Sequence, residues 1–242
     1  MKKLKIGIIG VGRLGYEHAC NIANRVPGSE LVAIADANFD RAKQVAEELG
    51  VTAVYNDPKD LCADPNVEAV AIINTASHVE MIKIAMDAGK HVFCEKPLAD
   101  TVEKCKEAEA IIAAHPELTF MLGFMRRYDH SYQVAKKKME NGDIGDVILV
   151  RCYSQDPISI IEGTLEYAPR SGGQFIDMSI HDFDLIRWLT GSEVKELWAT
   201  GGCYEFKQYK DWDDGDNVSG LMKMENDAMA FFFAGRAAAH GS

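Results

Sequence analysis

The fold of this chain is decided near its beginning, by the stretch LKIGIIGVGRLG at residues 4–15. Its apolar half predicts a buried strand, and its glycine half has the spacing G-x-G-x-x-G. Between a strand and a helix, the first glycine allows a tight turn and the second lets a pyrophosphate approach the backbone. The third lets the helix pack closely on the strand. The residues predicted to bind a dinucleotide here are Gly10, Gly12, Arg13, Leu14 and Gly15.

An acidic residue after the next apolar run indicates which dinucleotide is bound. The run Leu31–Ala35 predicts a second strand, and Asp36 follows it directly, roughly 20 residues beyond the glycine loop. A carboxylate at this point accepts hydrogen bonds from ribose hydroxyls and repels a 2′-phosphate, which favours NAD over NADP. Arg13 argues the other way, because a nearby arginine accommodates a 2′-phosphate.

The pattern of apolar runs changes half-way along the chain. The first half alternates unbroken apolar runs with amphipathic stretches, which predicts a doubly wound parallel Rossmann sheet, an α/β domain, over residues 1–123. The second half predicts an α+β domain over residues 124–242. Its strands near 147–153, 194–203, 218–224 and 228–234 are expected to form a mostly antiparallel open sheet, interrupted by one long helix from Gly173 to Thr190.

The composition is that of an ordinary globular protein, with 47% hydrophobic and 26% charged residues. The formal net charge of −11 argues against a broad nucleic-acid-binding surface. The six cysteines form no C-x-x-C pair, so no zinc or redox site is predicted, and scattered reduced thiols fit a cytoplasmic protein. No segment approaches the ~20 apolar residues of a membrane span.

Two further motifs carry side chains suited to acid–base chemistry. Lys96 lies in the motif CEKPL (residues 94–98) after a predicted parallel strand, at the edge where such sheets bind ligands, although a lone lysine is usually only solvated. Asp177 and His181 are four residues apart in the predicted long helix, so a carboxylate on the same face could orient the imidazole as a general base. Taken alone, such a pair is more often part of the surface of an amphipathic helix. His18 has no evident partner.

Together these motifs resemble the glucose–fructose oxidoreductase/inositol dehydrogenase/rhizopine catabolism (Gfo/Idh/MocA) family. The resemblance rests on the glycine loop, Asp36, the Glu95-Lys96-Pro97 motif and the pattern G-G-x-x-x-D-x-x-x-H at residues 172–181. It covers essentially the whole chain. The segments at residues 123–129 and 154–184 look most like the inositol 2-dehydrogenase branch.

The resemblance implies an NAD-dependent dehydrogenase that oxidises a secondary alcohol of a cyclic polyol or sugar, first of all myo-inositol, to the ketone. By this likeness Lys96 polarises the reacting oxygen, Asp177 orients the pair and His181 takes the hydroxyl proton. A cis bond at Lys96–Pro97 is also implied. Further cofactor contacts are implied for Thr75, His78, Glu95 and Lys96, and further substrate contacts for Arg127 and Asp156.

The family ordinarily continues beyond Ser242, so the second domain is expected to be incomplete relative to it, with an exposed sheet edge. The run Phe231–Phe233 predicts a strand with one face in the core and the other in a subunit contact, so we expect a homo-oligomer formed through the C-terminal sheet. Two alternatives stay open, a non-catalytic NAD-binding regulatory protein and an inactive truncated family member. The presence together of Lys96, Asp177 and His181 argues against a sensor, and the shortened second domain argues for one.

Overall fold

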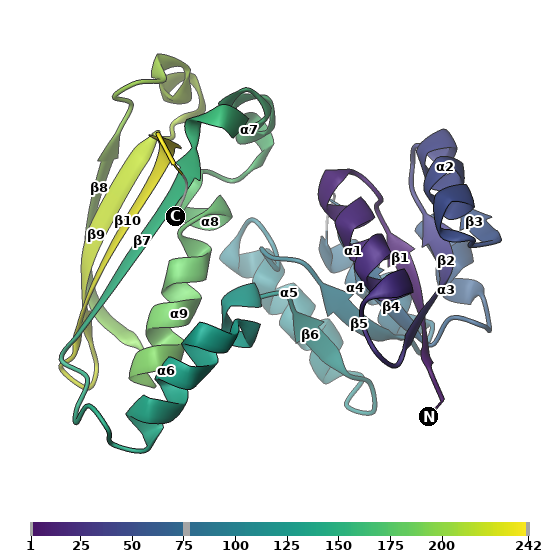
Figure 1. Cartoon of the computed structure of the whole chain (residues 1–242), viewed down its shortest axis with the longest axis horizontal. Helices are drawn as coiled ribbons and strands as arrows, with labels where there is room; N and C mark the ends of the chain where they lie inside the picture. Colours follow the sequence, from purple (N-terminus) through teal and green to yellow (C-terminus); the bar gives the residue numbers. More distant parts are fainter. Residues whose placement is uncertain (1, 75–77, 241–242) are drawn as a thin grey trace. The chain divides into compact units, whose positions relative to one another are not determined.

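The computed structural model describes residues 2–74 and 78–240, and the chain divides into two compact units, Met1–Gly123 and Phe124–Ser242. Each unit has its own sheet, of six strands in the first and four in the second (Figure 1). Among the described residues, no helix is long and apolar enough to cross a bilayer.

The sheet of the first unit is parallel throughout. Its strands are β1 (Leu4–Ile9), β2 (Ser29–Ala35), β3 (Ala53–Tyr55), β4 (Ala69–Ile72), β5 (His91–Cys94) and β6 (Phe120–Leu122). They lie in the order β3-β2-β1-β4-β5-β6, and every pairing is parallel. This is the doubly wound order in which the chain changes direction beside β1, and ligands bind beyond the carboxyl ends of the strands at that point. The predicted Rossmann sheet is confirmed.

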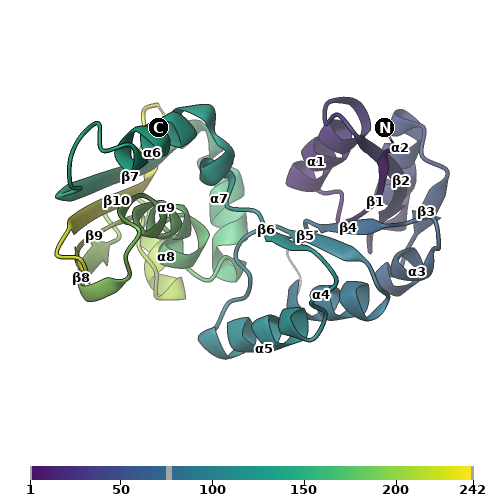
Figure 2. The same cartoon turned by 90° about the horizontal axis from the view of Figure 1, so that it is seen from below.

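Helices cover both faces of this sheet (Figure 2). Helices α1 (Arg13–Asn24) and α2 (Phe39–Leu49) pack on one face, and α3 (Pro58–Ala63), α4 (His78–Asp87) and α5 (Val102–Ala113) pack on the other. Ile8 and Ile9 of β1 are buried in opposite layers, the first under α1 and α2 and the second under α3 and α4. Burial on both faces is why the strands read as unbroken apolar runs.

The second unit has a mixed sheet that is mostly antiparallel. Its strands are β7 (Leu149–Pro157), β8 (Val194–Gly202), β9 (Asn217–Met224) and β10 (Met229–Ala238). In the order β7-β10-β9-β8, the pairs of β9 with β8 and β10 are antiparallel, and β10 with β7 is parallel. The parallel pair, β7 and β10, joins strands that are far apart in the sequence, because several helices and the strands β8 and β9 lie between them along the chain.

One face of this second sheet carries the helices α6 (His130–Glu140), α8 (Gln174–Asp177) and α9 (Ile180–Thr190), as Figure 1 shows. The side chains of β10 alternate accordingly. Ala230 and Phe232 are fully buried under the helices, whereas Phe231 and Phe233 belong to the opposite face. Helix α7 (Ile161–Tyr167) follows the end of β7 and was not predicted.

The predicted long helix from Gly173 to Thr190 is wrong, because the chain breaks it between α8 and α9. The N–H of Ser179 donates to the carbonyl of Gln174, five residues back, and the N–H of His181 donates to the carbonyl of Met178, three residues back. Ser179 is the residue before α9, and its side chain makes no capping hydrogen bond there. Asp177 therefore closes one helix while His181 lies in the first turn of the next.

Candidate active site

The three glycines of the first loop are required for three different reasons. Gly10 has a φ of +89°, and a Cβ there would lie 2.7 Å from the backbone nitrogen of Asn74. A Cβ on Gly15 would lie 1.9 Å from the carbonyl oxygen of Gly10, so helix α1 could not pack against the turn. A Cβ on Gly12, in contrast, would meet no described atom within 4 Å. Gly12 therefore borders the open space that a pyrophosphate needs to approach the backbone.

The beginning of helix α1 is suited to hold that pyrophosphate. The first helical hydrogen bond runs from the N–H of Tyr16 to the carbonyl of Gly12 at 2.9 Å. The N–H groups of Arg13, Leu14 and Gly15 precede it and lie at the positive end of the helix dipole. Arg13 and Leu14 are both exposed. The residues present thus fit the diphosphate of a dinucleotide.

Asp36 directly follows β2 and is tied to the glycine loop. Its Oδ2 accepts the N–H of Val11 at 2.7 Å, and its Oδ1 accepts the N–H of Asn38 at 2.8 Å. Arg41 donates from Nε to the carbonyl of Val11 at 3.1 Å, so Val11 is held from both sides. A carboxylate has about four lone-pair positions. Asp36 can therefore hold the loop and still accept hydrogen bonds from ribose hydroxyls.

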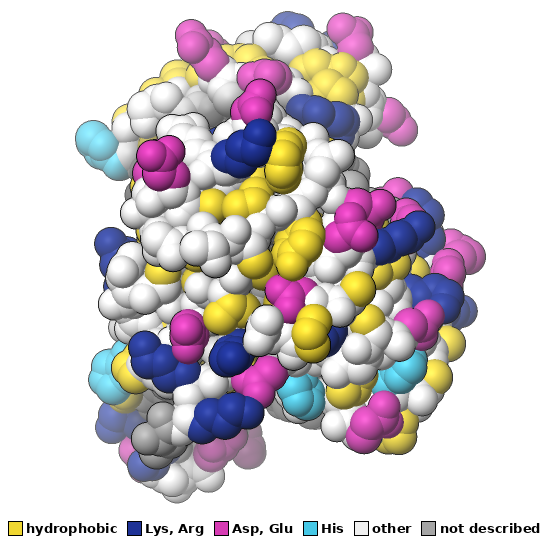
Figure 3. Space-filling model, turned by 90° about the vertical axis from the view of Figure 1, so that its right-hand side faces the viewer, with side chains coloured by type: hydrophobic (Ala, Val, Ile, Leu, Met, Phe, Trp, Pro, Cys, Tyr) yellow, Lys and Arg dark blue, Asp and Glu magenta, His cyan; other side chains and the backbone are white. Residues whose placement is uncertain are grey.

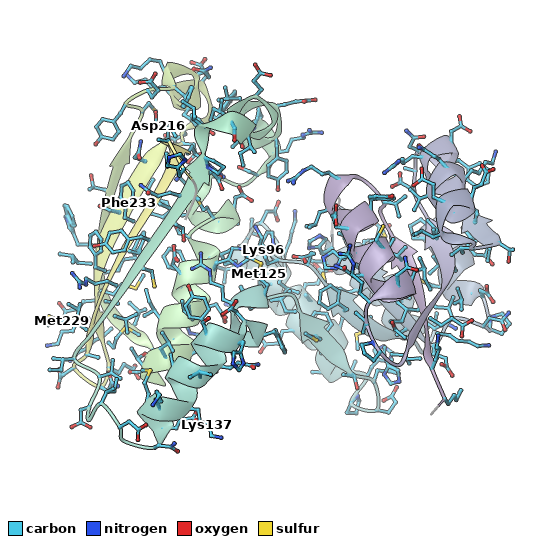
Figure 4. The ribbon with its side chains drawn as sticks, in the orientation of Figure 1. Lys96, Met125, Lys137, Asp216, Met229 and Phe233 are labelled. Atoms are coloured by element: carbon cyan, nitrogen blue, oxygen red, sulfur yellow. The ribbon has the colours of Figure 1, made fainter. Side chains whose placement is uncertain are left out.

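The loop after β5 carries Lys96, which is labelled in Figure 4. The implied cis peptide bond at Lys96–Pro97 is confirmed. Within this loop, Glu95 Oε2 accepts the backbone N–H of Lys96 at 3.2 Å, while Glu95 Oε1 lies 2.9 Å from Nε2 of His18 on helix α1. His18 also packs its ring against Phe93, with the ring centroids 5.5 Å apart. The Lys96 loop and the glycine loop are thus joined through the helix between them.

His78 joins the same loop to the end of β4. Its Nδ1 lies 2.7 Å from the carbonyl oxygen of Pro97, and its Nε2 lies 2.7 Å from that of Asn74. Both ring nitrogens face backbone oxygens, so this side chain positions two loops at the carboxyl edge of the sheet. Its contact with a cofactor stays a prediction. The predicted cofactor residue Thr75 lies outside the described residues.

In the second unit, Asp156 and Asp177 are bridged by one arginine. Arg236 on β10 donates from Nη1 to Oδ2 of Asp156 at 2.8 Å and from Nη2 to Oδ2 of Asp177 at 2.6 Å. Burial by itself would lower the pKa of Arg236, but the Asp177 and Asp156 carboxylates outweigh it and raise that pKa. The cluster lies at the end of the sheet marked by Asp216 in Figure 4, since the N–H of Arg236 donates to the carbonyl of Asp216.

Arg127, whose contact with substrate stays a prediction, is paired with a carboxylate of its own unit. Its Nε and Nη2 form a bidentate pair with Asp184 of α9 at 2.8 and 2.7 Å. Its neighbour Arg126 is bonded to Asp182 and, at 2.7 Å, to the hydroxyl of Ser154. Burial raises the pKa of Asp182, although Arg126 and Ser154 lower it in part. These pairs fix α9 to the segment that begins the unit, so the geometry gives these arginine donors a structural role.

Three buried cysteines are unsuited to act as nucleophiles. Burial raises the pKa of Cys94 and Cys152 to about 12 each, and that of Cys62 to about 11. Such groups are neutral thiols at physiological pH. Among the described residues, no cluster of three His, Cys, Asp or Glu side chains could hold a metal ion.

Charged side chains on the surface are mixed in sign. On the face that Figure 3 presents, Lys and Arg side chains are interspersed with Asp and Glu. The side chains described on that face form no broad positive field of the kind that binds a nucleic-acid backbone.

Comparison with known proteins matches both units of the chain. Residues 4–124 match the model of an oxidoreductase family with an NAD-binding Rossmann fold, described as GFO/IDH/MocA, and residues 132–242 match the C-terminal domain of the same family. The chain belongs to the Gfo/Idh/MocA family. It is therefore an NAD-dependent oxidoreductase.

Several members of this family are similar over nearly the whole chain. Myo-inositol 2-dehydrogenase of Thermotoga maritima is 37% identical over 98% of this chain and 70% of its own length. A crystal structure of scyllo-inositol dehydrogenase from Lactobacillus casei, with bound NAD(H) and scyllo-inositol, has a TM-score of 0.93 at 40% identity, covering 99% of this chain and 71% of that one. The myo-inositol 2-dehydrogenase structure from Lactobacillus plantarum has a TM-score of 0.94 at 40% identity, with 99% and 71% covered.

Sequence reasoning missed two residues in this Gfo/Idh/MocA chain. Arg236 could have been found from the alternation of β10, because it continues the buried row Ala230, Phe232 and Ala234 with a charge. His18 gave no signal of this kind, since its partner Glu95 is 77 residues away.

Proposed function

We propose that this chain oxidises a secondary alcohol of a cyclic polyol to the ketone and passes the hydride to NAD, with myo-inositol and scyllo-inositol as the first substrates to test. The proposal is carried by the presence of Lys96, Asp177 and His181 in a chain whose relatives include named myo- and scyllo-inositol dehydrogenases. Myo- and scyllo-inositol differ in configuration at one carbon, and relatives named for each are similar to this chain, so the proposal covers both.

The proposed chemistry assigns a role to each of three side chains. NAD supplies the acceptor for the hydride. His181 takes the proton of the substrate hydroxyl, and a positioned base of this kind contributes about 10²–10⁴-fold. The ammonium of Lys96 stabilises the negative charge that develops on the same oxygen. Asp177 keeps the group of side chains oriented. The carbon loses a hydride and its oxygen loses a proton, so alcohol and NAD⁺ give ketone, NADH and H⁺.

We propose that the second unit supplies the contacts to the remaining hydroxyls of the substrate. Asp156 lies at the end of β7, and one of its oxygens already accepts from Arg236. A carboxylate can accept further hydrogen bonds from hydroxyls. For this reason Asp156 is a stronger candidate than Arg127, whose Nε and Nη2 are bonded to Asp184.

The direct test is turnover with a panel of polyols. Purified protein with NAD is offered myo-, scyllo- and D-chiro-inositol and glucose, and NADH formation is followed. We expect NADH from at least one inositol and little from glucose. Binding of NAD without NADH from any member of the panel would contradict the proposal and favour the non-catalytic regulatory alternative.

Matched variants test the roles of the side chains. Lys96→Met and His181→Asn should each lower kcat/KM by about 10²-fold or more while leaving the NAD dissociation constant nearly unchanged. The controls are Lys104→Met and His130→Asn, which change an exposed side chain of the same type in the same unit. Full activity in either catalytic variant would remove that residue from the proposed mechanism.

We also propose that copies of the chain associate through the open face of the second sheet. Phe231, Leu221 and Trp198 are direct cross-strand neighbours on β10, β9 and β8. Leu221 and Trp198 are 55% and 63% exposed, and Tyr153 packs on Phe231 with ring centroids 5.6 Å apart. A contiguous exposed apolar row of this kind marks an interaction surface.

A further inference from the structure

We propose that Arg236 is a positioning residue, whose guanidinium holds the carboxylates of Asp156 and Asp177 at a fixed separation and orientation for substrate. This inference rests on the proposed function, because it assigns Arg236 to the same reaction. Neither the glycine motif nor the Lys96 and His181 motifs point to this residue.

Arg236 uses its donors differently from Arg127 and Arg187 of the same unit. Arg127 donates two hydrogen bonds to the one carboxylate of Asp184, and Arg187 donates two to that of Glu193. Arg236 instead directs Nη1 to Asp156 and Nη2 to Asp177. A guanidinium is rigid and planar, so two bonds to different carboxylates fix the distance between those carboxylates. A guanidinium that donates both hydrogen bonds to one carboxylate fixes the position of that carboxylate alone.

The burial of Arg236 is difficult to explain by stability alone. Its side chain is 4% exposed, and it ends the buried row of β10 formed by Ala230, Phe232 and Ala234. A buried ion pair is often no more stabilising than apolar residues of similar volume, because removing the charges from water offsets their attraction. The arginine is therefore better explained by the two carboxylates that it holds.

The surroundings of Arg236 fix both the arginine and one of its partners. The N–H of Arg236 donates to the carbonyl of Asp216 at 2.9 Å. Two residues earlier, Asp214 accepts the N–H of Gln174 on its Oδ1 at 2.9 Å and so caps helix α8, which ends at Asp177. One short loop therefore anchors the arginine by its backbone and the helix that carries Asp177. Rigid support of this kind is what holds a catalytic group within about 0.5 Å of its working position.

The segment of Asp216 is itself held by several hydrogen bonds. The carboxylate of Asp216 accepts the backbone N–H groups of Tyr204, Glu205 and Phe206 at 2.9, 2.7 and 2.7 Å. Burial alone would raise the pKa of Asp216, but these bonds outweigh it and lower the pKa. The loop of Asp216 is thus held in place, and it supports Arg236, which in turn holds the carboxylates of Asp156 and Asp177.

The kinetic test compares Arg236→Lys with Arg236→Gln. Lysine keeps the charge but is a single point donor that does not span two carboxylates as a planar fork does, whereas glutamine removes the charge. We expect kcat to fall about 10-fold in Arg236→Lys and about 10²-fold or more in Arg236→Gln. A displacement of a catalytic group by 1 Å can lower the rate by about 10²-fold. The NAD dissociation constant should stay within about threefold of wild type, since the cofactor contacts lie in the other unit. Arg187→Gln, which removes an exposed fork, is the matched control and should keep wild-type kcat.

A purely structural role for Arg236 gives a different result. Both variants would then lower the midpoint of thermal unfolding but keep wild-type kcat per folded molecule, and the conservative lysine would give no graded rescue. That outcome overturns the proposal. If Arg236→Gln fails to fold, Arg236→Lys alone still decides, because wild-type kcat in that variant contradicts a need for the fork.

A crystal structure of Arg236→Lys or Arg236→Gln supplies a readout that needs no turnover. We expect the carboxylate of Asp177 to move by more than about 0.5 Å relative to Asp156, which is the tolerance of a catalytic group. Unchanged carboxylates overturn the positioning role even if the wild type is an active dehydrogenase. A displaced Asp177 in a protein that oxidises no polyol instead supports the placement by Arg236 and contradicts the proposed function.

Discussion

His18 Nε2 lies 2.9 Å from Glu95 Oε1, and this pair joins the helix behind the glycine loop to the loop that carries Lys96. Burial by itself would raise the pKa of Glu95, but the hydrogen bond and charge of His18, with smaller contributions from Lys96, outweigh it and lower the pKa. The carboxylate is therefore ionised at neutral pH and connects two segments that are distant in sequence. The first unit thus has a direct link between the cofactor loop and the proposed reacting lysine.

Replacing Glu95 by glutamine should weaken the first unit in a pH-dependent way. A carboxyl whose pKa is lowered by folding stabilises the fold fully above its ordinary value of 4.5, and this contribution is lost as the pH falls below that value toward the folded pKa. We expect Glu95→Gln to reduce the free energy of unfolding by about 1–3 kcal/mol at neutral pH, and by less in acid. Urea unfolding of both proteins at neutral pH and below pH 4.5 measures the loss of unfolding free energy under the two conditions.

The control for Glu95 is Asp100→Asn, which breaks a solvent-exposed pair with Lys104 in the same unit. Exposed ion pairs contribute less than about 1 kcal/mol, so this variant should differ little from wild type. A Glu95→Gln protein whose stability equals that of wild type at both pH values would show that the pair with His18 contributes nothing.

Alanine at Gly12 and alanine at Gly15 should affect different properties, the first NAD affinity and the second the stability of the fold. A Cβ on Gly12 meets no described atom within 4 Å, so Gly12→Ala should keep the stability of the protein without NAD and lower its NAD affinity at least about 10-fold, because the methyl group occupies the path of the pyrophosphate. A Cβ on Gly15 lies 1.9 Å from the carbonyl of Gly10, so Gly15→Ala should destabilise the protein itself. Thermal unfolding and calorimetric NAD titration separate the two. An unchanged NAD affinity in Gly12→Ala would place the pyrophosphate elsewhere.

Asp36→Asn tests the choice between NAD and NADP. The amide oxygen can still accept the N–H of Val11, so the glycine loop keeps its anchor, but the negative charge that repels a 2′-phosphate is removed. We expect the ratio of NADP to NAD dissociation constants to fall about 10-fold or more, mainly through tighter NADP binding. Asp40→Asn removes an exposed charge from the first turn of α2 and should leave the ratio unchanged. The same ratio in wild type and Asp36→Asn would exclude Asp36 as the discriminating group.

The parts of the fold that the sequence predicts are those with a local signal. Strand β1 was recognisable because Ile8 and Ile9 are buried on opposite faces, which leaves no polar alternation. The break after Asp177 was not, because Ile176, Ile180 and Phe183 continue the apolar spacing of a helix straight through it. Hydrophobic periodicity records which side of a segment is buried and not which carbonyl each N–H selects.

The candidate site divides in the same way. The glycine loop and Asp36 could be predicted because their chemistry requires particular residues at a particular spacing. Arg236 meets Asp156 and Asp177 only after β10 has paired in parallel with β7, strands that are separated by most of the second unit. The alternation of β10 could have marked Arg236 as a buried charge, but the sequence does not name the carboxylates that it meets.

Association through the open face of the second sheet can be tested by one charge. Leu221→Lys places an ammonium group between Phe231 and Trp198, so burying this face against another copy would require the removal of that charge from water. We expect light scattering with size-exclusion chromatography to show a smaller species than for wild type, with circular dichroism unchanged. Leu197→Lys is the matched control, because Leu197 is 58% exposed but pairs with the buried Met222 and so belongs to the helix-covered face. If Leu221→Lys keeps the wild-type assembly, or if wild type is itself monomeric, the open face is not the subunit contact.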